Sequence, residues 1–63
     1  MSTPPKDRFF RVYANLPVGL RDQVIIVLPE VGPMSWNAVY IEVSNNTKLG
    51  DTIVEKLVEL KII

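Results

Sequence analysis

The feature that most constrains this fold is a run of five aliphatic residues, Val24 to Leu28. Valine and isoleucine favour extended backbone. Successive side chains of a strand point to opposite faces, so an unbroken aliphatic run predicts a strand that is covered on both faces. We therefore expect a strand from Asp22 to Leu28 that lies centrally in a sheet or against a partner. Pro29 ends its pairing, and a turn over residues 30–33 follows.

The rest of the chain is too short to cover such a strand easily. It has 63 residues, of which 48% are hydrophobic. A domain of this size buries only about 60% of its unfolded surface, and it usually needs a disulfide, a metal or a partner. The sequence contains no cysteine and no histidine. Packing and oligomerisation remain as stabilising devices, and we expect a homodimer.

A second strand is expected at Arg8 to Leu16, where the sequence is aromatic and β-favouring. With a period of two, Phe10, Val12 and Ala14 fall on one face of it. The break at residues 17–19 then predicts a hairpin in which residues 8–16 pair antiparallel with residues 22–28. Pro4 and Pro5 indicate a flexible tail over residues 1–7, ahead of a single small domain at 8–63.

The segment from Ser35 to Ser44 fits two structures. As a helix it would begin at Ser35 and place Trp36, Val39, Tyr40 and Val43 on one face. As a strand its β-branched residues would alternate with polar ones. The sequence leaves both open.

The most regular helical pattern runs from Thr47 to Leu60. Thr47 can cap this helix, and Asp51 lies where the helix dipole favours an anion. The spacing places Leu49, Ile53, Leu57 and Leu60 within one arc, expected to face the core. The fold class is thus α+β: a β-hairpin at 8–16 and 22–28, then one or two helices, the last at 47–60. The alternative is a three-stranded meander followed by the C-terminal helix.

Composition excludes several classes of function. Without histidine or cysteine there is no zinc site of the usual type, no thiol nucleophile and no Ser-His-Asp triad. The three glycines match no phosphate-binding loop. We therefore expect no enzyme activity, no cofactor and no metal. No aliphatic run approaches the roughly 20 residues of a membrane span, and the first residues are no signal peptide. We expect a cytoplasmic protein with no membrane partner.

The last helix carries more apolar residues than a small sheet can cover, and such an excess often marks a contact surface. Trp36 and Tyr40 are further anchors of the kind that interfaces use. Either set can instead belong to a wider core. The candidate interface consists of Val54, Val58, Ile62, Ile63, Trp36 and Tyr40. This predicts a small regulatory protein that self-associates and binds a protein partner, with an antitoxin-like component of a toxin–antitoxin pair as one alternative role.

A nucleic-acid platform is the other alternative. Basic residues interleaved with aromatics can hold phosphates while the rings stack on bases. The candidate contacts are Lys6, Arg8, Phe9, Arg11, Tyr13 and Arg21. Seven basic residues balance seven acidic ones, which weakens this interpretation because phosphate binding depends on positive charge.

Overall fold

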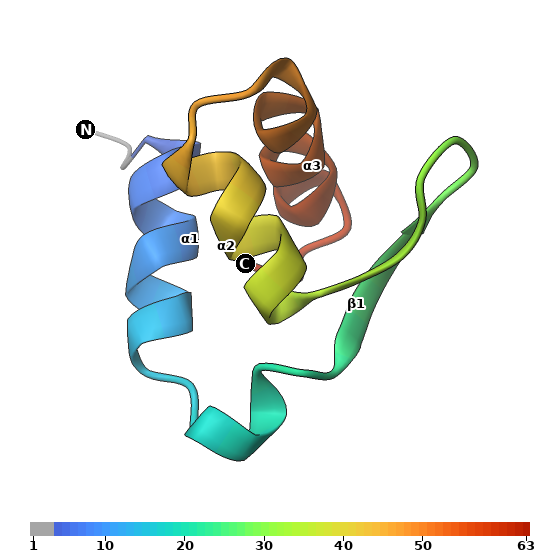
Figure 1. Ribbon diagram of the computed structural model, residues 1–63. Helices are drawn as coiled ribbons and strands as arrows, with labels where there is room; N and C mark the ends of the chain where they lie inside the picture. The colour runs from blue at the N-terminus through green and yellow to red at the C-terminus, as the bar shows by residue number, and fades with distance from the viewer. Residues whose placement is uncertain (1–3) are drawn as a thin grey trace.

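A computed structural model describes residues 4–63 as three helices and one hairpin (Figure 1). The elements in chain order are α1 (Pro5–Ala14), the short 3-10 helix η1 (Val18–Leu20), β1 (Val24–Leu28), β2 (Gly32–Ser35), α2 (Trp36–Ser44) and α3 (Lys48–Glu59). The predicted α+β class, with an antiparallel two-stranded hairpin followed by helices, is confirmed. The residues that form that hairpin differ from those expected.

The predicted strand at 8–16 is wrong, because residues 8–14 belong to helix α1 and residues 15–16 follow its end. With a helical period, Phe9, Val12, Tyr13 and Leu16 fall within an arc of about 100°. All four pack into or against the core, as does Phe10 beside this arc. Pro5 occupies the first turn, where its missing N–H costs no helical bond. Residues 5–7 are therefore helical instead of part of a tail, while residues 1–3 lie outside the described residues.

Strand β1 pairs with β2, and not with residues 8–16. Its register joins Ile26 to Met34, Val27 to Pro33 and Leu28 to Gly32, with a bulge between Val24 and Ile26. The turn is closed by the Val31 N–H, which donates to the Leu28 carbonyl at 3.3 Å. Gly32 then adopts a φ of +93°, which favours glycine.

The segment after β2 is a helix, so the three-stranded meander is wrong. The Ser35 hydroxyl accepts a hydrogen bond from the Ala38 N–H at 3.2 Å and caps α2. Trp36, Val39 and Val43 are the buried residues of this helix. Their helical spacing outweighs the β-branched composition, because it places all three side chains against one core.

Helix α3 is confirmed nearly at its predicted bounds. The Thr47 hydroxyl accepts a hydrogen bond from the Gly50 N–H at 2.9 Å, as expected of an N-cap. Ile53, Val54 and Leu57 are buried. Leu60, predicted to face the core, is instead 59% exposed, because the helix has ended before it. Lys61 then takes a φ of +58°, and the chain turns back so that Ile63 packs against the core.

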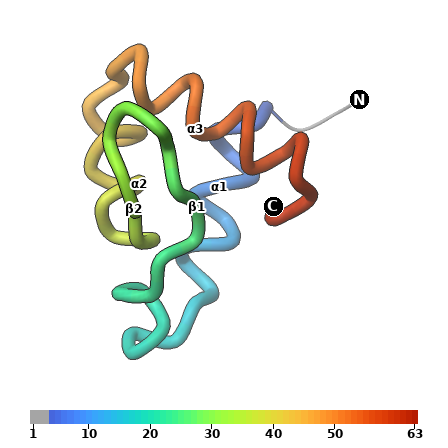
Figure 2. The backbone as a smooth tube through the Cα atoms, turned by 90° about the vertical axis from the view of Figure 1, so that its right-hand side faces the viewer, coloured from blue at the N-terminus to red at the C-terminus, as the bar shows by residue number. Residues whose placement is uncertain are grey.

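The core lies between the three helices and the inner face of the hairpin. Figure 2 looks onto the hairpin with the helices behind it. The helices contribute the most deeply buried large side chains, among them Phe9, Val39, Ile53 and Leu57, each with 0% exposure. The hairpin contributes Ile26 and Met34, which are paired across the strands. The hairpin thus covers one side of the helices with only one of its two faces.

Gly50 sets how closely α2 and α3 approach. A Cβ at this position would lie 2.7 Å from the Glu42 carbonyl oxygen and 2.8 Å from its carbon. Both are backbone atoms of α2, so the contact can be relieved only by moving one helix. Glycine is kept here by close packing.

Replacing Gly50 by alanine should therefore destabilise the fold by about 1–3 kcal/mol, the usual cost of overpacking, although alanine is the better helix former. Urea unfolding followed by circular dichroism measures the change. Gly19→Ala is the matched control, because nothing lies within 4 Å of a Cβ built there. Equal stability of the two variants would contradict this account of the α2–α3 contact.

Candidate functional site

The hairpin carries exposed aliphatic side chains, two of them on the face turned away from the core. Val24 is 56% exposed and Val27 67%, while Val31, in the turn, is 48% exposed and lines a depression with Leu49, Thr52 and Lys56 of α3. Leu20, which precedes the hairpin, is 38% exposed. We call these four residues the arm surface. Together with Val18 they account for five of the nine large hydrophobic side chains that are exposed within residues 4–63.

The bulge in β1 explains why the two central valines face outward together. In a regular strand, residues three apart point to opposite faces. The extra residue at the bulge breaks this alternation, so that Ile25 and Ile26 both pack toward the core. Val24 and Val27 are left on the opposite face. The five-residue aliphatic run is therefore divided between a covered face and a bare one.

An aromatic cluster joins α1 to α2 near the start of the hairpin. Phe9 stacks on Trp36 with ring centroids 6.0 Å apart, and Tyr13 stacks on Tyr40 at 4.4 Å. The guanidinium carbon of Arg21 lies 4.4 Å from the Tyr13 ring centroid, in a cation–π contact. The strand pattern gave no reason to expect these rings together, because they meet only when both segments are helices.

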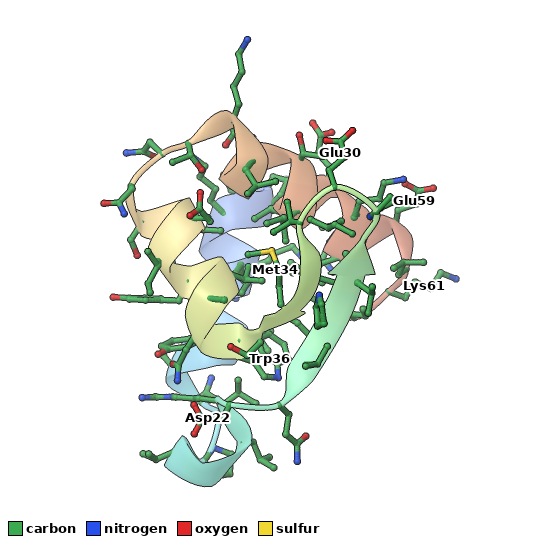
Figure 3. All side chains as sticks on the ribbon, turned by 45° about the vertical axis from the view of Figure 1, so that its right-hand side comes forward. Asp22, Glu30, Met34, Trp36, Glu59 and Lys61 are labelled. Carbon is green, nitrogen blue, oxygen red and sulfur yellow. The ribbon has the colours of Figure 1, made fainter. Side chains whose placement is uncertain are left out.

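A chain of hydrogen bonds fixes the base of the arm to the same cluster. The Tyr13 hydroxyl donates to Asn37 Oδ1 at 2.8 Å, and Asn37 Nδ2 donates to Asp22 Oδ1 at 2.9 Å. The Asn37 backbone N–H also donates to the Arg21 carbonyl at 3.0 Å. Figure 3 shows Asp22 and Trp36 at this end of the hairpin. The start of β1 is thereby held in place on α1 and α2.

The predicted interface does not form one surface. Val54 and Trp36, with exposures of 2% and 8%, are core residues. Val54 is buried because α3 packs against α1 and α2, and Trp36 is buried on α2, where it stacks on Phe9. Val58 and Ile63 are half-buried, and Ile63 packs against the core. Tyr40 is 38% exposed and Ile62 36%, but Tyr40 lies on α2 and Ile62 follows α3.

The predicted nucleic-acid platform is not assembled either. Its premise was an exposed strand face, whereas Phe9 is fully buried in a helix. Lys6 forms an ion pair with Asp51 at 3.1 Å, and Arg8 donates to the Ile63 carbonyl. Tyr13 and Arg21 stack on each other. Arg8 and Arg11 are the exposed basic residues of the set on α1.

Two surface depressions lie against α3. One, of about 340 Å³, lies between the start of α1 and α3 and is open and lined by Pro4, Pro5, Lys6, Asp51, Val54 and Glu55. The other, of about 190 Å³, lies between the hairpin turn and α3. Over residues 4–63, no group of three acidic side chains lies close enough to hold a metal ion. Asp51, Glu55 and Glu59 are exposed along α3.

The arm surface was absent from the predicted site residues, although the sequence contained a signal for it. The unbroken run at Val24 to Leu28 predicted a strand with both faces covered, by the chain or by a partner. Among the described helices, none has the length and apolarity to cross a membrane. No model of a known protein family, no curated protein and no solved structure matches the chain.

Removing the Tyr13 hydroxyl tests the link between the arm and the helices. Tyr13→Phe should lower the free energy of unfolding by about 1 kcal/mol, because Asn37 loses a donor that is partly buried. Tyr40→Phe is the control, since the Tyr40 hydroxyl has no hydrogen-bond partner within the described part of the chain. Urea unfolding of both variants gives the comparison, and equal losses would show that the Tyr13–Asn37 bond does not stabilise the arm.

Proposed function

We propose that this chain is a small non-enzymatic interaction protein that binds another polypeptide through the arm surface, a second copy of the chain included. The observation that supports this most is the bare outer face of β1. Val24 and Val27 are more than half exposed, whereas Ile26, on the other face of the same strand, is buried. Contiguous exposed aliphatic surface on a small protein usually marks a binding site.

The size of the chain agrees with this role. A standard interface removes about 800 Å² from each partner. That would cover roughly a fifth of the 4344 Å² surface of this chain. The aromatic cluster and its hydrogen bonds hold the base of the hairpin on the helices. A rigid arm loses little conformational entropy on binding.

A nucleic-acid role finds less support. The two aromatic residues that were to stack on bases are Phe9, which is buried, and Tyr13, whose ring already stacks on Tyr40 and Arg21. Net charge is zero, with seven residues of each sign. Binding to phosphates would then lack both its stacking platform and its electrostatic attraction.

Photo-cross-linking in the host cell tests the proposed surface. A photoreactive amino acid replaces Val27 in one variant and Ile41 in the other. Ile41 is the matched control, because it is also an exposed aliphatic residue, at 56%, but lies on α2. Adducts with protein are expected from position 27 and not from position 41. Equal yields, or adducts from position 41 alone, would overturn the assignment of the arm as the binding surface.

A further inference from the structure

The outer edge of β1 has unpaired backbone groups in a defined pattern. The carbonyls of Gln23 and Leu28 point across the hairpin, because they accept from the N–H groups of Trp36 and Val31, each at 3.3 Å. Residues along an antiparallel strand alternate between facing the partner strand and facing away. Val24 and Val27, the immediate neighbours of these two residues, therefore direct their N–H and C=O groups outward. Neither valine forms a backbone hydrogen bond beyond the hairpin within residues 4–63.

The opposite edge of the hairpin is closed to strand pairing. Pro33 is the partner of Val27, so by the same alternation its backbone nitrogen faces the outer side of β2. Proline has no N–H, and this position accordingly offers no donor. Two residues later the chain enters α2, whose N-cap is Ser35. One edge of this small sheet is thus blocked and the other is open.

We propose that the open edge pairs with a second copy of this chain. Strand β1 lies antiparallel to β1 of the partner across a two-fold axis, with Val24 of each copy opposite Val27 of the other. The result is a four-stranded sheet in which the β2 strands lie outermost. This inference rests on the proposed function and specifies its partner and geometry.

The sequence of the edge is self-complementary in this register. An interface across a two-fold axis requires that residue i meets residue j while j meets i. Val24-Ile25-Ile26-Val27 reads the same in both directions, as antiparallel self-pairing requires. Direct pairing also requires that Val24 and Val27 face the same side of the sheet, which the bulge accomplishes. Both valines present their backbone groups outward, so each pair can exchange two hydrogen bonds.

The register concerns the strand itself, Val24–Leu28. Leu20 and Arg21 lie outside it, because Leu20 ends η1 and Arg21 has a helical backbone conformation.

Disulfide trapping tests the register, and the chain is suited to it because it contains no cysteine. The variants Val24→Cys and Val27→Cys are prepared separately, and one of them is isotope-labelled so that the mixed dimer and the two homodimers differ in mass. The two variants are then mixed in equal amounts and oxidised. Residues opposite each other are about 5.5 Å apart at Cα, which a disulfide can bridge. Residues that are three positions out of register are roughly 10 Å apart, which is too far for a disulfide to bridge. Intact-mass spectrometry should therefore find the mixed dimer well above the half that random pairing yields.

Other geometries give other products. Packing of the two outer faces against each other would separate the backbones by about 10 Å and leave little disulfide of any kind. Pairing centred on Val27 would yield the Val27→Cys homodimer instead. Either product distribution overturns the proposed register. Ile41→Cys is the control, since its exposure, 56%, equals that of Val24, and it should give only background dimer.

Sedimentation equilibrium of the purified unmodified chain separates this inference from the proposed function. We expect twice the monomer mass of 7.1 kDa, a return to the monomer for Val27→Lys, and no change for Ile41→Lys. A monomeric unmodified chain would overturn the self-pairing. If position 27 still cross-links to a different protein in cells, the arm remains a binding surface with another partner. If it cross-links to nothing, the proposed function fails as well.

Discussion

The structure depends on one constraint: a two-stranded hairpin has two faces, and a chain of this length has helices for only one of them. The inner face receives Ile26 and Met34 and closes the core over α1, α2 and α3. The outer face keeps Val24 and Val27 in water. A single bulge decides which residues go to which side, because it turns two successive isoleucines inward. The remaining features either support the inner packing or follow from the bare outer face.

The inner packing is held by aromatic and polar contacts of different kinds. Phe9 lies at the centre, in contact with the rings of Phe10, Tyr13 and Trp36 at centroid distances of 5.8–6.0 Å. The polar chain from Tyr13 through Asn37 to Asp22 then ties the start of β1 to α1 and α2. Since these bonds join residues before β1 to α1 and α2, this chain also fixes the direction in which the hairpin leaves the helices.

Part of this fold follows from local sequence. Helix α3 was predictable because Thr47 is a good cap and the apolar period is sustained over three turns. Strand β1 was predictable from its composition. Helix α1 was not identified, because apolar residues at 9, 10, 12 and 13 fit a period of two as well as a helical one. Strand β2 contains Gly32 and Pro33, which locally indicate only a turn, and pairing with β1 alone makes it a strand. The candidate site was likewise predictable only in part. The aliphatic run of β1 predicted a strand covered on both faces, and within the chain only one face is covered. Of the residues chosen as an interface, Val54 and Trp36 belong to the core, which depends on how α1 packs.

Amide hydrogen exchange at Val27, measured by NMR over a range of protein concentrations, tests the central claim most directly. The Val27 N–H has no acceptor within the hairpin if the ladder alternates as derived, so it exchanges fast in an isolated chain. The account predicts that its exchange slows as concentration rises, while the Ile26 amide, which faces β2, is protected throughout. Fast exchange of Val27 at every concentration would contradict the claim that this edge is a contact surface between copies of the chain.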